Sequence, residues 1–274
     1  MKFFIILLVY FSQVYAFEVG HGKSIVIVTN SHQGTLSDGN RTLTLLPHPN
    51  HKTNGFVILP IDYHATLGKQ ELQWRGTDTN LVLDLDTVQV SYPVETLSVD
   101  STKVTPPLET LERIAIEKTE AEKIYATTTP KRYWNKPFIR PIDSNTTSEY
   151  GSQRTYNGTL KSYHGGVDFR ARTPLPILAS NDGTVVLAKD RYYSGETVII
   201  DHGEGLYTCY FHFSRLNVKA GEMVQRGQAI GLSGATGRIT GPHLHFGIMI
   251  HGIQTDPIDL LTQINKLFGE QEVF

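Results

Sequence analysis

Two short motifs in the second half of the chain combine histidine and aspartate at spacings that suit a metal ion. They are His164-Gly-Gly-Val-Asp168 and His243-Leu-His245, and a further histidine, His212, lies between them. Imidazole nitrogen and carboxylate oxygen are ligands that Zn²⁺ accepts, and a catalytic zinc site has three protein ligands and one open position. The set therefore predicts one metal ion that acts on a bound water molecule.

The local sequence indicates how the donors could meet. His243-Leu-His245 lies in an apolar stretch typical of a strand, where positions i and i+2 point to one face, so both imidazoles should face one cavity. Two glycines follow His164, and a bend there can bring it to Asp168. An isolated His-x-His pair is more often solvated or hydrogen-bonded than bound to metal. The conjunction of the two motifs therefore carries the prediction.

Longer stretches around these residues strengthen the prediction of a metal site. The stretches 163–169, 205–214, 218–231 and 234–246, in this order, resemble the M23 (LytM/lysostaphin-like) family of zinc metallopeptidases. The resemblance runs from about Phe138 to Leu261. It implies a small antiparallel β-fold with a groove, one zinc ion in the groove, and hydrolysis of peptide cross-links in bacterial peptidoglycan.

The same resemblance implies a division of roles among the five residues. His164, Asp168 and His245 match the three zinc ligands. His212 and His243 match two histidines that are not ligands and that flank the metal-bound water and the scissile carbonyl. Because imidazole titrates near neutral pH, either histidine could take the proton of the water or stabilise the oxyanion.

Other polar residues near these motifs are candidates for substrate binding. Arg154 and Asn157 precede the first motif, and Arg154 lies where the resembled family often has a basic residue lining the groove. Thr236, Arg238 and Thr240 belong to the glycine-rich run before His243. A solvated loop arginine and ordinary turn chemistry explain these residues equally well.

The start of the chain predicts an exported protein. Met1-Lys2, the apolar run from Phe3 to Phe11, and the small residue Ala16 have the order of a secretory signal peptide, residues 1–16. The run is too short for a bilayer, which needs about 20 residues, so no stable membrane span is expected. The expected location is the periplasm or cell envelope.

The amino-acid composition narrows the class of protein further. The single cysteine, Cys209, allows no internal disulfide, and the formal net charge of -2 provides no basic field for nucleic acid. A chain of 274 residues with 39% hydrophobic content can form one large core or two modest ones.

The pattern along the chain favours two mainly β-domains. Short alternating runs over 17–105 predict a β-sandwich-like N-terminal domain, and 106–130 reads as an amphipathic linker helix. Residues 131–274 are again strand-like and predict the antiparallel metallopeptidase domain with its groove. The N-terminal domain could position the enzyme on the wall, bind a regulatory protein partner, or cover the groove.

Two functions follow as alternatives. The first is a zinc endopeptidase that cuts cross-linked stem peptides of peptidoglycan, at a D,D-bond, during cell-wall remodelling. The second is a non-catalytic LytM-like protein that binds peptidoglycan or activates an amidase. Because silent relatives typically lack one of the five metal or catalytic residues, which are all present here, the sequence favours the enzyme.

Overall fold

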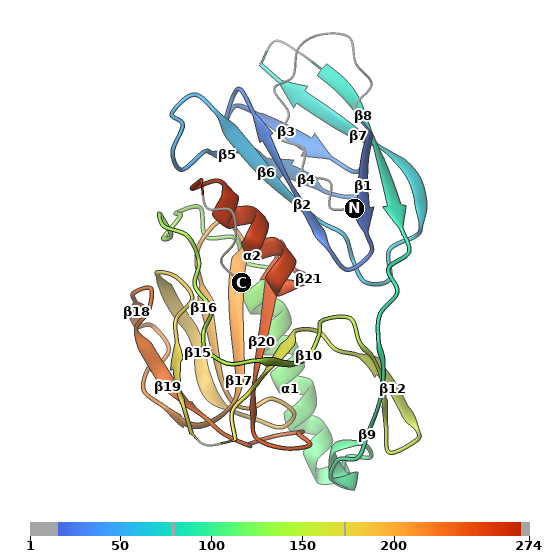
Figure 1. Ribbon diagram of the computed structural model, residues 1–274, viewed down its shortest axis with the longest axis vertical. Coiled ribbons are helices and arrows are strands. Elements are labelled where there is room, and N and C mark those ends of the chain that lie inside the picture. Colours follow the sequence, from blue (N-terminus) through green and yellow to red (C-terminus); the bar gives the residue numbers. More distant parts are fainter. Residues whose placement is uncertain (1–15, 78–79, 173, 270–274) are drawn as a thin grey trace. The chain divides into compact units, whose positions relative to one another are not determined.

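The computed structural model describes residues 16–77, 80–172 and 174–269, and the chain is mainly β-structure in these ranges, as predicted (Figure 1). Its contacts divide it into two compact units. Among the described residues, the first unit comprises those up to Ser91 together with 259–269, and the second runs from Tyr92 to Ile258. Residues 92–130, which the sequence analysis divided between the first domain and a linker, therefore group with the second unit.

The first unit packs two small sheets around one core. Apolar residues of both sheets, such as Leu72 and Leu85 of one and Val57 and Leu59 of the other, form a single buried cluster. One pair of neighbouring strands, Ala16–Gly20 with Asn80–Val88, is parallel and the other neighbours are antiparallel. The strands in spatial order are β1 (Ala16–Gly20), β8 (Asn80–Val88), β7 (Gly68–Gly76), β3 (Gly34–Ser37) and β4 (Thr42–Thr44) in one sheet, and β2 (Ser24–Thr29), β6 (Gly55–Pro60) and β5 (Leu46–Pro47) in the other.

A C-terminal helix, α2 (Pro257–Lys266), contributes most of its length to this first unit. The Gln263 side chain accepts a hydrogen bond from the Val26 backbone N–H and donates one to the Ser24 carbonyl. These two bonds satisfy backbone groups of β2 that lie outside its pairing with β6.

The second unit is built on a ten-stranded sheet whose pairings are antiparallel. Its long middle strands are mostly buried. The spatial order is β10 (Thr146–Ser148), β13 (Val167–Arg170), β20 (His243–Ile250), β17 (Leu206–Leu216), β16 (Gly195–Asp201), β15 (Gly183–Arg191) and β18 (Met223–Val224). β14 (Pro176–Leu178) pairs with β19 (Ala229–Ser233), β19 also pairs with β17, and β21 (Ile253–Thr255) pairs with β20.

A separate three-stranded sheet lies in the same unit. Its order is β12 (Leu160–Tyr163), β11 (Gln153–Tyr156) and β9 (Val94–Leu97). β9 joins β11 in parallel, with Glu95 opposite Arg154. A short 3₁₀ helix, Ser101–Lys103, follows β9 along the chain.

One face of the large sheet carries the helix α1 (Leu108–Tyr125), which begins after Pro107. Ile124 and Tyr125 pack against a cluster of Leu187, Ile199 and Tyr207. The side chain of Glu117 is buried and accepts a hydrogen bond from the Tyr192 backbone N–H. Leu108, Leu111 and Ile116, by contrast, are exposed, so only some of the apolar residues of the helix lie on its buried side.

The predicted signal peptide, residues 1–16, lies outside the described residues except for Ala16. Among the described helices, neither has the length and apolar character needed to cross a bilayer.

Candidate metal centre

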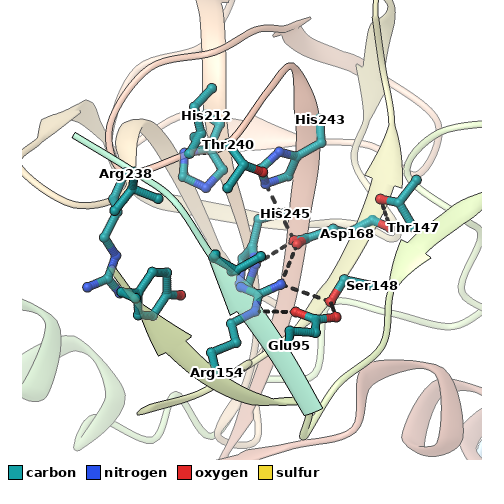
Figure 2. A pocket seen from close by; sticks show the side chains of 14 residues that line it. Glu95, Thr147, Ser148, Arg154, Asp168, His212, Arg238, Thr240, His243 and His245 are labelled. Atoms are coloured by element: carbon teal, nitrogen blue, oxygen red, sulfur yellow. Dashed lines mark hydrogen bonds and ion pairs between the residues drawn. The ribbon is translucent and has the colours of Figure 1, made fainter. Parts of the chain in front are cut away.

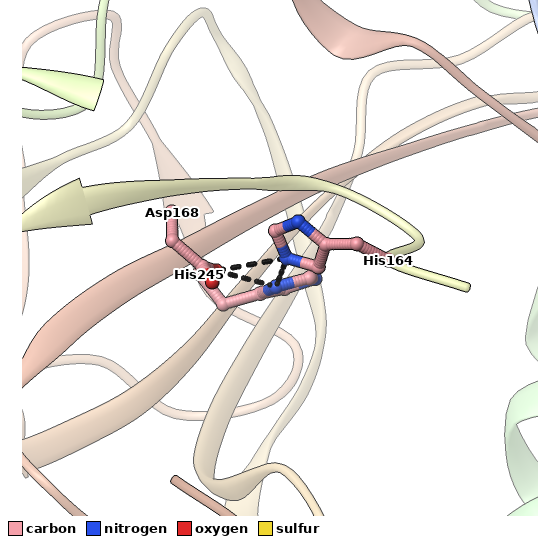
Figure 3. A group of neighbouring side chains, drawn as sticks. All are labelled: His164, Asp168 and His245. Atoms are coloured by element: carbon pink, nitrogen blue, oxygen red, sulfur yellow. Dashed lines mark hydrogen bonds and ion pairs between the residues drawn. The ribbon is translucent and has the colours of Figure 1, made fainter. Parts of the chain in front are cut away.

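Two neighbouring strands and the turn before one of them bring three donor groups together (Figure 3). Asp168 on β13 lies directly opposite His245 on β20, and antiparallel partners of this kind have adjacent side chains. His164 Nε2 lies 2.9 Å from Asp168 Oδ1 and 2.9 Å from His245 Nδ1, which is 3.0 Å from Asp168 Oδ1. All three residues are buried. Three lone-pair donors thus point at one place.

At Gly166 the turn has no room for a side chain, and at Gly165 the nearest atoms are the end of the Gln254 side chain. A Cβ on Gly166 would lie 2.5 Å from the Phe246 carbonyl oxygen and 2.6 Å from His245 Nε2. A Cβ on Gly165 would lie 2.3 Å from the Gln254 side chain. Neither glycine has a positive φ, so the turn needs close approach to β20 rather than unusual backbone freedom.

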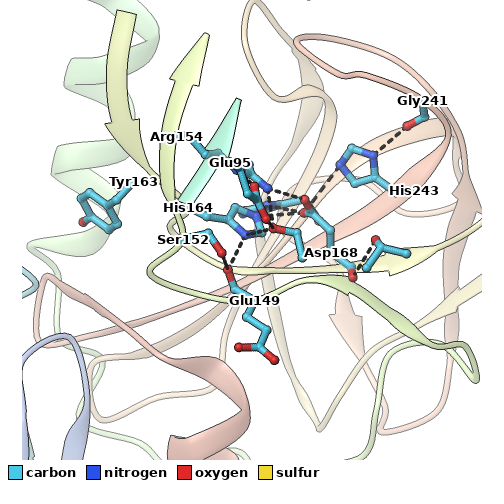
Figure 4. Close-up of polar contacts among 12 residues, drawn as sticks. Glu95, Glu149, Ser152, Arg154, Tyr163, His164, Asp168, Gly241 and His243 are labelled. Carbon is cyan, nitrogen blue, oxygen red and sulfur yellow. Dashed lines mark hydrogen bonds and ion pairs between the residues drawn. The ribbon is translucent and has the colours of Figure 1, made fainter. Parts of the chain in front are cut away.

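Surrounding groups orient the donors (Figure 4). His164 Nδ1 lies 2.8 Å from the Glu149 carbonyl oxygen. Because a carbonyl can only accept, Nδ1 carries the proton and Nε2 presents a lone pair. The second oxygen of Asp168, Oδ2, accepts a hydrogen bond of 2.8 Å from Arg154 Nη2, and the His245 ring stacks on Phe211. Such outer partners fix the tautomer and direction of metal ligands.

The donor set fits a zinc ion in number and chemistry. Burial would raise the pKa of Asp168, but the imidazoles of His164 and His245 outweigh it and hold that pKa well below its usual range. Burial also lowers the pKa of His245 to about 4, so this imidazole is neutral at physiological pH. Tetrahedral bonds of about 2.0–2.1 Å would separate ligand atoms by roughly 3.3 Å, a few tenths more than the observed distances. A carboxylate and two imidazoles therefore converge on one place that suits a divalent cation.

His212 and His243 lie beside these donors without joining them. Their rings contact each other, with centroids 4.8 Å apart. His212 Nδ1 lies 2.7 Å from the Thr236 carbonyl oxygen, and His243 Nδ1 lies 2.7 Å from that of Gly241. Both carbonyls hold the proton on Nδ1, which leaves Nε2 as the basic atom in each neutral ring.

The backbone of His212 is strained. Its φ is +69°, an uncommon value for a residue other than glycine, and it occurs where β17 is irregular. Burial first, and then the neighbouring His243 and His245, lower the pKa of His212 to about 3. A buried imidazole in a costly conformation is typical of a functional position.

A pocket of about 190 Å³ joins these side chains (Figure 2). Asp168, His212, His243 and His245 line it, as do Arg238 and Thr240 from the run before β20. The structure therefore brings the two candidate catalytic histidines, two of the candidate ligands and three of the candidate substrate contacts, with Arg154 as the third, into one cavity.

Three of the five candidate substrate contacts have their polar side-chain groups bonded within the protein. Arg154 lines the pocket, but its guanidinium donates to Glu95 and Asp168. The Asn157 side chain bonds both backbone groups of Val99. Thr236 Oγ1 donates to the Phe213 carbonyl and accepts from the Glu196 N–H. These three side chains hold the site's surroundings in place.

Sequence reasoning missed several residues of this pocket. Glu95, Leu97 and Val99 line it from β9 and the segment after it, and Ser148 lines it from β10. No motif marks them, because they enter through strand pairings that the sequence does not specify. Tyr193, on the turn between β15 and β16, contacts Arg238 and was also missed.

Comparison with known proteins places this geometry in a family. Residues 162–257 match the model of Peptidase family M23. The peptidoglycan DD-endopeptidase ShyA of Vibrio cholerae is 42% identical over 115 residues, which are 41% of this chain and 27% of ShyA. ShyC of the same organism is 38% identical over 144 residues, which are 51% of this chain and 33% of ShyC. The chain thus spans a third or less of the length of these curated relatives.

A solved structure is similar over more of the chain. A crystal structure described as a peptidase M23 from Pseudomonas aeruginosa has a TM-score of 0.68 and 25% sequence identity. The alignment covers 87% of this chain and 93% of that chain. The likeness therefore includes residues of both units.

Proposed function

Because this chain belongs to peptidase family M23 through residues 162–257, we propose that it is a zinc metalloendopeptidase that hydrolyses peptide cross-links of bacterial peptidoglycan. The names of ShyA and ShyC support a D,D-bond as the target and cell-wall remodelling as the process. The observation that carries the proposal is the convergence of His164, Asp168 and His245 in a site that also presents His212 and His243.

The three converging donors hold one zinc ion in this proposal. Zinc in such a site polarises a carbonyl and lowers the pKa of its water to about 7. Glu149 and Arg154 keep His164 and Asp168 aimed at the ion through the bonds described above. Three protein ligands leave a position open for the reaction.

His212 and His243 divide the proton transfer and the stabilisation of the oxyanion between them. In each ring Nδ1 is held on a backbone carbonyl, so Nε2 is the nitrogen that acts: the histidine that takes the proton of the water uses an unprotonated Nε2, and the one that stabilises the oxyanion donates from a protonated Nε2. The strained backbone of His212 fixes its ring in the pocket before substrate arrives, so little reorganisation is needed during the reaction.

Substrate contacts come from the pocket rim. We assign this role to Arg238 and Thr240, which line the pocket, and assign Arg154, Asn157 and Thr236 to the support of the site. The substrate, peptidoglycan stem peptides, lies outside the cytoplasm. A signal peptide over 1–16 and a periplasmic or envelope location belong to the same proposal, and a regulatory protein partner of the first unit is compatible with it.

A digest of purified, cross-linked muropeptides tests this function. The mature protein should convert the cross-linked dimer to monomers, and mass spectrometry should place the cut at the D,D-bond. A chelator should abolish the product and added zinc should restore it, while His164→Ala serves as the matched inactive control. If no chelator-sensitive product forms, the non-catalytic alternative replaces the enzyme.

A further inference from the structure

Arg238 is held more firmly than a surface arginine in a loop. Its backbone N–H donates to the Tyr193 carbonyl at 2.8 Å. Its guanidinium carbon lies 4.4 Å from the centre of the Tyr156 ring and 4.9 Å from that of the Tyr193 ring. Two aromatic rings therefore contact one cation, an arrangement that stabilises a guanidinium and restricts its rotation.

The loop that carries Arg238 is itself fixed against the turn between β15 and β16. A Cβ on Gly237 would lie 2.5 Å from both the Tyr193 carbonyl oxygen and the Gly195 nitrogen. Both glycines have positive φ, +82° and +61°. The two turns are thus in backbone contact, and Arg238 projects from a rigid platform.

The charge of Arg238 has no acidic partner within the described part of the chain. The pocket contains the carboxylates of Glu95 and Asp168, but Arg154 binds both of them. Figure 2 shows Arg238 on the other side of the pocket from that cluster. An arginine whose faces are covered by rings keeps its N–H edge for a ligand, and the ligand that fits that edge is a carboxylate.

We propose that Arg238 binds a free carboxylate of the substrate and so selects cross-links that carry one beside the scissile amide. This inference rests on the proposed function and adds the substrate class. A cross-link through a diamino diacid has such a group, because the carbon that bears the acylated amine also bears a carboxylate. A lysine-type cross-link, or one in which that carboxylate is amidated, lacks the charge.

Two matched substrates test the proposal. One is a cross-linked muropeptide with the free carboxylate, and the other is the same molecule with a carboxamide at that position. The wild-type enzyme should cleave the carboxylate form with kcat/KM about 10- to 100-fold higher, the range for one charge-assisted hydrogen-bonded contact. Arg238→Gln should reduce cleavage of the carboxylate form to the level of the carboxamide form and leave the latter unchanged. Equal loss on both substrates, or no preference in the wild type, overturns the proposal.

A binding measurement separates this inference from the proposed catalysis. Chelator-treated protein cannot cleave, so its dissociation constants for both muropeptides can be measured by calorimetry. Arg238→Gln should weaken binding of the carboxylate form about 10-fold or more and spare the carboxamide form. Arg215→Gln, which removes an exposed arginine outside the pocket, is the matched control and should change neither. Selective binding without cleavage would refute the proposed endopeptidase activity but support the carboxylate-binding role of Arg238. Cleavage without selectivity would refute the role of Arg238 alone.

The aromatic contact provides an internal check. Tyr193→Phe retains the ring and should keep the discrimination, while Tyr193→Leu should reduce it. Thermal unfolding of each variant verifies that the fold is intact. If Tyr193→Leu discriminated between the two substrates as well as the wild type does, the Tyr193 ring would have no role in positioning Arg238.

Discussion

Adding one methyl group at Gly166 should disable the metal centre without removing a ligand. In Gly166→Ala the new Cβ would lie 2.5 Å from the Phe246 carbonyl oxygen and 2.6 Å from His245 Nε2. An ordinary contact needs about 3.4 Å, so the turn and the ring must separate by roughly 0.8 Å. Zinc ligands tolerate deviations of only about 0.2 Å, and changes at groups that orient ligands typically cost 10- to 100-fold in metal affinity.

Competition with a chromophoric zinc chelator measures this effect. We expect the affinity of Gly166→Ala to fall by about 10- to 100-fold, with a parallel loss of muropeptide cleavage at limiting zinc. Gly241→Ala is the matched control, because a Cβ at Gly241 meets no atom within 4 Å although His243 is two residues away. If Gly166→Ala retained wild-type affinity while its melting temperature was unchanged, the argument from close approach would be wrong.

Three further predictions concern other buried side chains. His212→Ala should lower kcat/KM by about 10²- to 10⁴-fold at unchanged zinc content, because His212 is not among the converging donors. Burial lowers the pKa of His202 to about 4. Below the pKa of about 6.5 that His202 has in the unfolded chain, the unfolded chain therefore binds a proton that the folded chain does not bind. Between pH 7 and pH 5 the free energy of unfolding should then fall by about 2 kcal/mol more in the wild type than in His202→Asn, measured by urea titration. Cys209, buried and with its pKa raised to about 12, should react with a thiol reagent only after unfolding.

Each of these three predictions has an outcome that would contradict it. Full turnover by zinc-loaded His212→Ala would remove its catalytic role. The same pH slope in the wild type and His202→Asn would mean that His202 is protonated in the folded protein. Rapid labelling of native Cys209 would mean that the face beneath α1 opens readily.

The sequence predicts the local part of the site well. Strand alternation placed His243 and His245 on one face, and the structure has them on one strand with Asp168 opposite His245. The sequence also indicated a turn at Gly165 and Gly166, but it indicated the wrong physical reason for glycine there. The sequence suggested a flexible bend, whereas the structure shows a turn pressed against β20.

The rest of the site depends on pairings between distant segments. Glu95 reaches Arg154 because β9 joins β11 in parallel, and nothing in either segment specifies that partner. Arg154 and Asn157 were expected to contact substrate, yet their polar groups are bonded to Asp168 and Val99. Polar side chains near a motif can satisfy the backbone and the ligands as readily as a substrate, and only the three-dimensional arrangement separates these roles.

The parallel strand β9 also determines how the protein can be dissected. Because Val94–Leu97 forms an edge of the sheet beside the pocket and Glu95 anchors Arg154, a fragment beginning at Lys131 would lose one wall of the pocket together with the first unit. Its activity would report several changes at once, namely the absence of residues of the first unit, the release of Arg154 and the loss of α1 from the large sheet. A fragment that begins at Tyr92 keeps that wall and α1, so comparing it with the full chain would isolate the contribution of the residues before Tyr92, and comparing the two fragments would isolate that of residues 92–130.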